Sequence, residues 1–145
     1  MAKVVSVNIS ERRGERKHSV PEIRLRVGHG IEEDAHAGNW HRQISLLAEE
    51  SIDMMRAACT FPLGAGVFAE NINTEGISLK TLPVGTRLGI GETVVEVTQI
   101  GKTCHNDCAI KKAAGQCVMP TDGIFAVVVN GGTVHPDDEI RVLEE

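Results

Sequence analysis

The feature that most constrains the fold of this chain is a series of short segments in which apolar and polar residues alternate, separated by glycine and proline. Successive side chains of a β-strand point to opposite faces, so this alternation predicts half-buried strands. In the segment EIRLRV, the residues Ile23, Leu25 and Val27 are expected to share the buried face. The segments that we expect to be strands are residues 3–10, 22–27, 92–100, 123–130 and 133–145, with a short apolar run at 43–48.

One segment has the spacing of a helix instead. Residues 48–59 place four apolar side chains on one stripe, and Pro62 ends the helix. The stripe consists of Ala48, Ile52, Met55 and Cys59. Because a strand is followed by a helix only once, the pattern argues against a parallel βαβ architecture. It favours a mainly β fold, a closed or nearly closed β-barrel with a few peripheral helices.

Turns are predicted where glycine and proline gather between the strands. Residues 83–85 and 89–91 are two such places. Gly131-Gly132 lies between the last two predicted strands and predicts that a tight β-hairpin joins them.

Composition argues against several classes of protein. The 145 residues are enough for one domain, 1–145, with a core of its own. A net charge of −5 and an aromatic content of 3% disfavour nucleic-acid binding, which needs a basic face and usually stacking aromatics. No apolar run is long enough for a membrane span, and the N-terminal residues lack the apolar core of a secretory signal. We therefore expect a cytoplasmic protein.

Three of the four cysteines lie within residues 101–117, GKTCHNDCAIKKAAGQC. In a reducing compartment such a cluster indicates catalysis or metal binding rather than disulfides. Cys104 directly follows the strongest predicted strand, and Lys102 and His105 flank it. Nearby cations favour the thiolate form of a cysteine, so a single reactive thiol at Cys104 is the leading interpretation.

A structural zinc site is the alternative interpretation of the same segment. Cys104 and Cys108 would share one face of a helix, and Cys117 or His105 would complete the site. The spacing C-x3-C-x8-C, however, matches neither zinc ribbons nor common iron–sulfur sequences.

A second group of polar residues lies in GHGIEEDAHAGNWHRQISLL, residues 28–47. Its polar members are His29, Asp34, His36, His41, Arg42 and Gln43. Arg42 offers a planar fork for phosphate or carboxylate, and His36 and His41 would line an anion pocket or tune a proton. The alternative is a polar corner whose groups hydrogen-bond one another and hold the barrel closed. For Asn71, further along the chain, a buried amide that braces a loop is the simpler interpretation.

Taken in order, four segments of the chain resemble the MOSC domain, the C-terminal domain family of molybdenum cofactor sulfurases. They are GHGIEEDAHAGNWHRQISLL, GVFAENINTEGISLKTLPVGTRLGIG, VVEVTQIGKTCHNDC and GIFAVVVNGGTVHPDDEI. The resemblance extends over nearly the whole chain and is greatest to the small stand-alone bacterial members. It implies a β-barrel with a cysteine at the end of a strand, near a pocket for a pterin–phosphate.

The resemblance assigns that cysteine to Cys104. In sulfurases the domain is thought to carry sulfur to the cofactor, and in amidoxime-reducing enzymes the matching cysteine ligates molybdenum. We therefore expect a molybdenum-cofactor binding protein in which Cys104 carries a persulfide, as in a sulfurtransferase, or ligates molybdenum in a small oxidoreductase. The residues expected to bind the cofactor are His36, His41, Arg42, Gln43, Asn71, Lys102 and His105. The alternative is a non-enzymatic scaffold or chaperone in which zinc is held by Cys104, Cys108 and Cys117.

The chain departs from the family pattern at three residues. Thr103 stands where the larger members have arginine, and Glu33 and Asp137 stand where the family has glycine, which concerns turn geometry. No pyridoxal-phosphate domain is present in the 145 residues, so we expect this chain to bind no pyridoxal phosphate itself. A separate cysteine desulfurase is then the expected sulfur donor, and molybdenum-cofactor enzymes or biosynthesis proteins are the expected acceptors.

Overall fold

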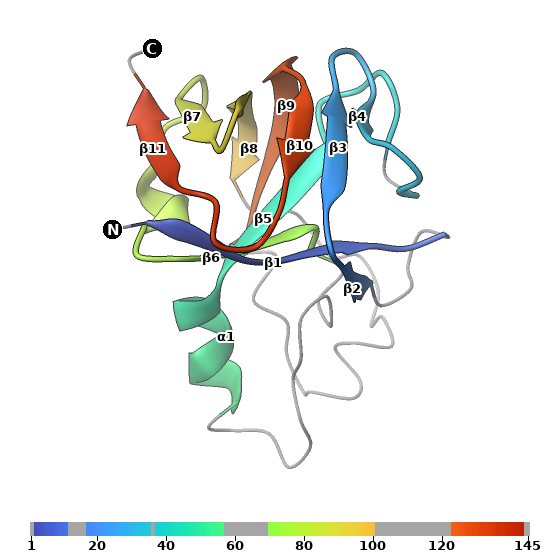
Figure 1. Cartoon of the computed structure of the whole chain (residues 1–145). Coiled ribbons are helices and arrows are strands. Elements are labelled where there is room, and N and C mark those ends of the chain that lie inside the picture. The colour runs from blue at the N-terminus through green and yellow to red at the C-terminus, as the bar shows by residue number, and fades with distance from the viewer. Residues whose placement is uncertain (1, 12–16, 36, 57–69, 101–122, 144–145) are drawn as a thin grey trace, which may run out of the picture.

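The computed structural model describes residues 2–11, 17–35, 37–56, 70–100 and 123–143, and this part of the chain is mainly β (Figure 1). The strands are β1 (Lys3–Ile9), β2 (His18–Val20), β3 (Ile23–Arg26), β4 (Gly30–Ile31), β5 (Ile44–Ala48), β6 (Ile72–Glu75), β7 (Arg87–Ile90), β8 (Thr93–Ile100), β9 (Ile124–Asn130), β10 (Gly132–Val134) and β11 (Ile140–Leu143). The helices are α1 (Glu49–Arg56) and the 3-10 helix η1 (Leu79–Thr81). The predicted mainly β fold is confirmed.

Eight of these strands form one mixed sheet, in the order β11-β7-β8-β9-β5-β6-β1-β2. The other three form a small antiparallel sheet in the order β10-β3-β4. Within the described chain, only β5 and β6 pair in parallel, and α1 lies between them in the sequence. Parallel pairing is therefore confined to the one place where a strand is followed by a helix.

The beginning and the end of the chain meet although β1 and β11 are far apart in the sheet order. Lys3 and Glu139 form an antiparallel bridge. Beside it, Val4 N donates to Asp138 O at 2.9 Å, and Val4 O accepts from Asp137 N at 2.8 Å. The residues just before β11 thus pair with the first residues of β1, at the side of the molecule where both termini lie (Figure 1).

Aliphatic side chains from both sheets form the core. Its members include Val4, Val7, Ile23, Leu25, Ile31, Ile44, Leu46, Ile72, Leu88, Ile90, Val95, Val97, Ile124, Ala126, Val128, Val134 and Ile140. A second group, consisting of Leu47, Ile52 of α1 and Phe125, is buried outside this cluster. β5 is therefore buried on both faces, which explains why residues 43–48 are almost continuously apolar rather than alternating.

The expected burial of Val27 is wrong. Ile23 and Leu25 are buried as the alternation predicts, but the side chain of Val27 is 60% exposed. β3 ends at Arg26, and the chain then turns through Gly28 at a φ of +78°. Because the strand has ended, the period of two no longer governs where Val27 points.

The predicted hairpin at Gly131-Gly132 is also wrong. β9 pairs with β5 and β8, whereas β10 pairs with β3, so the two glycines carry the chain from the large sheet to the small one. A Cβ on Gly131 would lie 2.5 Å from Leu25 O, and one on Gly132, at a φ of +149°, would lie 2.5 Å from the Glu92 carboxylate. Gly131 therefore allows a close approach to the backbone of β3, and Gly132 adopts a φ that residues with a side chain rarely adopt; neither forms a tight hairpin turn.

Three smaller expectations need adjustment. Gly89 and Ile90 belong to β7, so the turn expected at 89–91 begins only at Gly91. The last predicted strand, 133–145, is divided into β10 and β11. In the expected helix 48–59, α1 accounts for Glu49–Arg56 and Ile52 is buried; the side chains of Met55 and Cys59 are outside the described part.

Candidate functional site

The predicted site residues divide into described and undescribed ones. Cys104, Cys108, Cys117, Lys102, His105 and His36 lie outside the described residues, so their roles stay predictions. His41, Arg42, Gln43 and Asn71 are described, and the structure places them in two different surroundings.

His41 and Arg42 converge on Gln99 near the C-terminal end of β8. Gln99 Oε1 lies 3.0 Å from His41 Nε2 and accepts a hydrogen bond from Arg42 Nε at 3.1 Å. The Arg42 guanidinium also lies over the Phe125 ring, 5.1 Å from its centroid, in cation–π geometry. We call His41, Arg42 and Gln99 the strand-end cluster.

A β-bulge in β8 aims Gln99 at this cluster. Val97 pairs with Ala126 and Gln99 pairs with Phe125, so Thr98 is the extra residue. Because Ala126 and Phe125 are adjacent and point to opposite faces of β9, the bulge puts Gln99 on the face opposite to Val97.

The backbone and ring of His41 are held as well. Thr98 Oγ1 contacts the carbonyl oxygens of His41 and, at 3.2 Å, of Phe125. The rings of Trp40 and His41 meet edge to face with centroids 5.8 Å apart. The side chain of His41 is nevertheless exposed, so a ligand can reach it.

Gln43 lies only one residue beyond Arg42 but is buried in the sheet. Its Oε1 accepts a hydrogen bond from Val128 N at 3.0 Å. Gly30 packs so closely on it that a Cβ there would come within 2.9 Å of Gln43 Cβ. The structure does not bring Gln43 into the strand-end cluster; cofactor binding by this residue stays a prediction.

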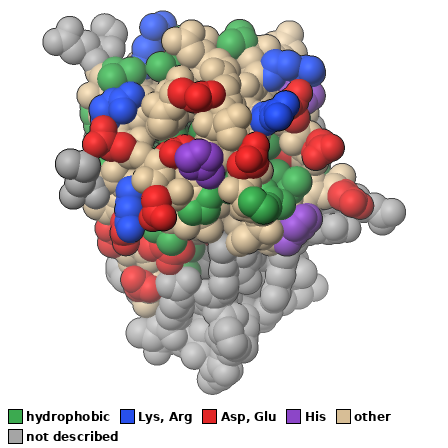
Figure 2. All heavy atoms as spheres, in the orientation of Figure 1, with side chains coloured by type: hydrophobic (Ala, Val, Ile, Leu, Met, Phe, Trp, Pro, Cys, Tyr) green, Lys and Arg blue, Asp and Glu red, His purple; other side chains and the backbone are tan. Residues whose placement is uncertain are grey.

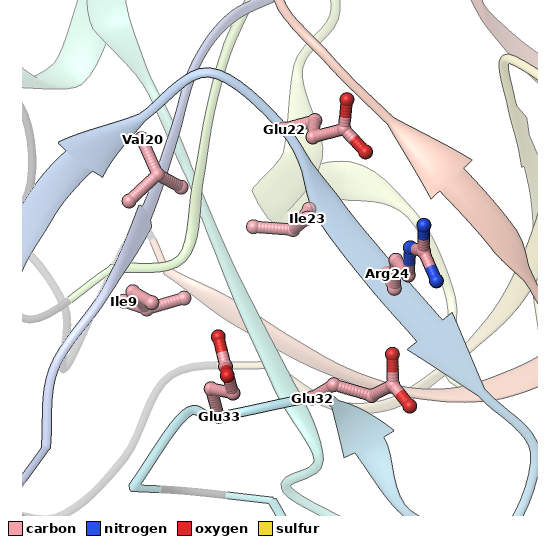
Figure 3. A pocket seen from close by; sticks show the side chains of 7 residues that line it. All are labelled: Ile9, Val20, Glu22, Ile23, Arg24, Glu32 and Glu33. Carbon is pink, nitrogen blue, oxygen red and sulfur yellow. The ribbon is translucent and has the colours of Figure 1, made fainter.

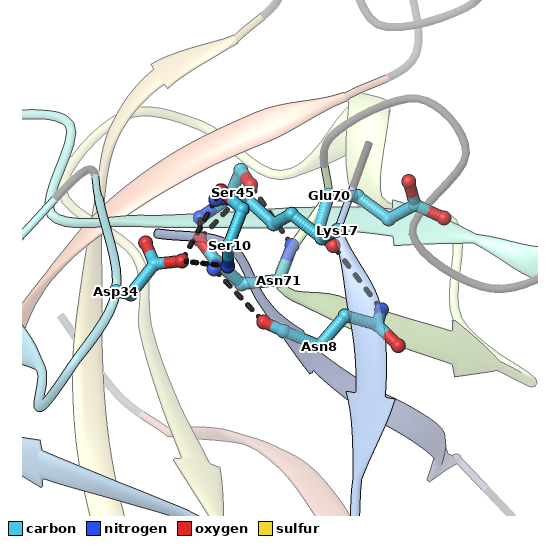
Figure 4. A network of polar contacts seen from close by, with 7 residues as sticks. All are labelled: Asn8, Ser10, Lys17, Asp34, Ser45, Glu70 and Asn71. Carbon is cyan, nitrogen blue, oxygen red and sulfur yellow. Dashed lines mark hydrogen bonds and ion pairs between the residues drawn. The ribbon is translucent and has the colours of Figure 1, made fainter. Parts of the chain in front are cut away.

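Asn71 is buried and its amide is engaged on both sides. Asn71 Oδ1 accepts from Ser45 N at 2.9 Å and from Ser45 Oγ at 3.1 Å, and Nδ2 donates to Asn8 O at 3.1 Å. These contacts link β5, β1 and the residue before β6, as Figure 4 shows. They support the interpretation of Asn71 as a brace, and cofactor binding by it is untested.

Asp34, from the same polar segment as His41, belongs to a buried ion pair. Its Oδ1 lies 2.8 Å from Lys17 Nζ, and neither side chain has any solvent exposure. Ser10 completes the contact, because its N–H donates to Asp34 Oδ1 at 3.1 Å and its Oγ accepts from Lys17 Nζ at 3.1 Å (Figure 4). For this half of the segment the internally bonded polar corner is the observed arrangement.

A separate cavity of about 470 Å³ lies between β2 and the turn that follows β4 (Figure 3). Ile9, Val20 and Ile23 line it together with Glu22, Arg24, Glu32 and Glu33. All four charged residues are at least partly exposed, and His41, Arg42, Gln43 and Asn71, the predicted site residues that the structure describes, are not among the described residues that line the cavity. On the face seen in Figure 2, acidic and basic side chains are interspersed and no basic patch forms.

Both residues that replace the glycines of the family pattern have left-handed backbones. Glu33 has a φ of +69° and Asp137 a φ of +75°. No other non-glycine residue of the described chain has a positive φ. The expectation that these two departures concern turn geometry is therefore confirmed.

Sequence reasoning missed Gln99 and Lys17. Gln99 stands in VTQIGKTC, directly before the cysteine segment, but a polar residue at the end of a strand gives no sign of a bulge. Lys17 follows the arginines of the first loop and gives no sign of burial. In the described part of the chain, no cluster of histidine, cysteine or carboxylate side chains could hold a metal ion, and no helix there is long and apolar enough to cross a membrane.

Fold and site together define a mainly β protein with a basic cluster at the end of one strand. The chain belongs to the MOSC domain family, whose pattern matches residues 33–141. Among curated proteins, none matches this sequence.

Several solved structures have a similar fold. The structure is similar to that of the YuaD protein from Bacillus subtilis, with a TM-score of 0.78 and 19% identity over 98% of this chain and 96% of that one. YiiM from Geobacillus stearothermophilus gives a TM-score of 0.76 at 18% identity over 99% and 76% of the two chains. YiiM from Escherichia coli gives 0.69 at 20% identity over 100% and 71%. At such identities the likeness shows the fold.

Proposed function

We propose that this MOSC-family protein binds the molybdenum cofactor through its phosphate at the strand-end cluster and presents Cys104 to it. The observation that carries the proposal is the convergence of His41 and Arg42 on Gln99, at the end of the strand from which the chain continues to Cys104. Cys104 is five residues beyond Gln99. Five residues span at most about 17 Å even when fully extended, so the thiol is tethered near the cluster.

The donor set of the cluster suits a phosphate. No described residue hydrogen-bonds the terminal Nη atoms of Arg42, which leaves its planar fork available for an oxyanion. His41 Nε2 and Arg42 Nε are already held by Gln99, so the two side chains are oriented before a ligand arrives. When bound, the cofactor supplies a redox-active molybdenum centre; the residues of this chain bind and orient it.

For Cys104 we propose the role of persulfide carrier. The thiol receives sulfane sulfur from a separate cysteine desulfurase and passes it on to the cofactor of molybdenum enzymes. Lys102 and His105, its neighbours in sequence, favour the reactive thiolate. Ligation of molybdenum by the same thiol is the competing role at this site.

The scaffold that we propose for this site is a nearly closed barrel. The bridge between Lys3 and Glu139 supports it, because β1 and β11 lie near opposite ends of the sheet order and the bridge joins β1 to the residues just before β11. A curved sheet of this kind would hold the end of β8 at a fixed distance from the start of β5.

The anion-binding part of the proposal is tested with Arg42→Ala. Calorimetric titration with a phosphorylated pterin should show tenfold to hundredfold weaker binding, since one charge-assisted contact contributes about 1.5–3 kcal/mol. Arg24→Ala is the matched control, because it removes an exposed arginine of β3 that makes no contact with the cluster. Equal affinity of wild type and Arg42→Ala would overturn this site.

The thiol role is tested with Cys104→Ser. After incubation with a cysteine desulfurase and cysteine, the variant should contain no sulfane sulfur, because a hydroxyl cannot replace a thiolate as nucleophile and leaving group. Its melting temperature should equal that of wild type, and Cys59→Ser should still acquire sulfane sulfur. A large fall in melting temperature with release of zinc would favour the scaffold alternative instead, because structural zinc is coupled to folding.

A further inference from the structure

We infer that Gln99 is a positioning residue that fixes the proton of neutral His41 and, because its amide is uncharged, leaves the positive charge of Arg42 for an oxyanion such as a phosphate monoester. The inference rests on the proposed function and adds to it how the site selects its ligand. It follows from the identity of one atom, Gln99 Oε1, and from what surrounds it.

The contact with Arg42 determines which atom Gln99 presents. Gln99 Oε1 lies 3.1 Å from Arg42 Nε. A guanidinium nitrogen only donates, so the atom that faces it must be the amide oxygen and not the amide nitrogen. The amide of Gln99 therefore has one allowed orientation.

That orientation in turn determines where His41 carries its proton. The same oxygen lies 3.0 Å from His41 Nε2, and an amide oxygen only accepts. Nε2 must therefore bear a hydrogen, and neutral His41 is held as the Nε2–H tautomer. Nδ1 is left as the nitrogen that gains the second proton when the ring becomes cationic.

The neutrality of the amide is what keeps the site attractive to anions. In the described part of the chain, no carboxylate forms an ion pair with His41 or Arg42. Among the described residues, those with contacts to His41 besides Gln99 are Trp40 through its ring, Thr98 through its hydroxyl at the His41 carbonyl, and Arg42 beside it on the same oxygen. A glutamate at position 99 would accept the same two hydrogen bonds but would neutralise the pair that a phosphate needs.

Strand geometry fixes the half-buried Gln99, on which both side chains of the pair converge. The bulge in β8 locks it opposite Phe125, a buried residue of β9, whereas His41 precedes β5 and is exposed. The rigid sheet therefore orients the two basic side chains, and the loop that carries them need not be rigid itself.

The test compares Gln99→Glu and Gln99→Leu with wild type in two measurements. Nitrogen-15 NMR of the neutral His41 ring should show the Nε2–H tautomer alone in wild type and a mixture of tautomers in Gln99→Leu. Titration with a phosphorylated pterin should show about threefold to tenfold weaker binding for Gln99→Leu and a larger loss, tenfold or more, for Gln99→Glu.

Asn130→Asp is the matched control for charge. It adds the same negative charge at the far end of β9, at an exposed residue, and should leave phosphate affinity within about twofold of wild type. Gln99→Glu preserves the side-chain volume, so the comparison remains decisive even where Gln99→Leu fails to fold.

The outcomes separate this inference from the proposed function. Equal phosphate affinity of wild type and Gln99→Glu would overturn the inference while leaving the anion site in place. Mixed His41 tautomers in wild type would overturn it as well. A locked tautomer in a wild-type protein that binds no phosphorylated pterin would overturn the proposed function and keep the positioning role of Gln99.

Discussion

Two polar regions of this molecule come from one stretch of sequence and end in opposite surroundings. In residues 28–47, Asp34 enters a buried corner with Lys17 and Ser10, whereas His41 and Arg42 meet Gln99 at the end of β8. In the buried corner the polar groups form hydrogen bonds and an ion pair with one another. The strand-end cluster holds its two basic side chains through a neutral amide. A high density of polar residues therefore does not by itself distinguish a structural corner from a candidate binding site. The charge of the partner side chain is what differs between the two regions.

The buried corner is therefore expected to determine stability, and the strand-end cluster to contribute little to it. A buried ion pair that loses one partner leaves the other charge without compensation in a medium of low polarity. An exposed side chain that loses its contacts returns to water at small cost. The predictions that follow are ordered by the size of the effect expected.

The largest effect is expected for Asp34→Ala. The variant removes the carboxylate that lies 2.8 Å from the buried Lys17 ammonium, which should lower the free energy of unfolding by about 3–5 kcal/mol. Chemical denaturation of wild type, Asp34→Ala and Arg42→Ala measures the contrast, and Arg42→Ala should lose no more than about 1 kcal/mol. The double variant Lys17→Met/Asp34→Ala should recover much of the loss, since it removes the uncompensated charge. If Asp34→Ala were as stable as wild type, the buried corner and the strand-end cluster would not differ in their contribution to stability.

A smaller loss is expected for Asn71→Ala. The change removes an acceptor from Ser45 N and a donor to Asn8 O, both buried, and should cost about 2–3 kcal/mol. Asn39→Ala, at an exposed asparagine, is the control and should be neutral within about 0.5 kcal/mol. If Asn71→Ala were stable but bound a phosphorylated pterin much more weakly than wild type, Asn71 would belong with the binding residues after all.

The smallest effect, and the only stabilising one, is expected for Glu33→Gly. At a φ of +69° a side chain costs about 1 kcal/mol, which glycine avoids, but glycine adds about 0.5–1 kcal/mol of chain entropy to the unfolded state. The net change should lie between zero and about +0.5 kcal/mol in stability, measured by thermal and chemical unfolding. Asp137→Gly should gain less, because aspartate tolerates this backbone better than glutamate does. A clear loss in Glu33→Gly would mean that the glutamate side chain itself is needed.

The sequence predicted what depends on periodicity and missed what depends on tertiary pairing. Strands such as β3, β8 and β9 follow from alternation, which is a local property. Gly131-Gly132 failed as a hairpin signal because the partner of β10 is β3, more than a hundred residues earlier. Gln99 was missed for the same reason. The direction of its side chain is set by a bulge against β9, and no residue type in the sequence predicts a bulge.

The candidate site was likewise predicted only in part. His41 and Arg42 were singled out because histidine and arginine so close together are unusual in a loop; the structure brings them together at Gln99, and ligand binding by them stays a prediction. Asp34 has the same kind of neighbours and is buried, and Lys17, its partner, stands among the charged residues of a loop. Whether a charge is exposed or paired inside depends on which segments meet, and spacing along the chain does not contain that information.

The pairing of residues 137–140 with the start of β1 has a consequence for how the protein is made. During synthesis β1 leaves the ribosome well before the residues that pair with its start, because Asp137 and Asp138, the partners of Val4, come more than a hundred residues later in the sequence. Contacts so distant in sequence form slowly, and an unpaired strand edge attracts other chains in the meantime. This part of the sheet can therefore form only after residues 137–140 have been synthesised, and until then the backbone groups at the start of β1 stay open to other chains.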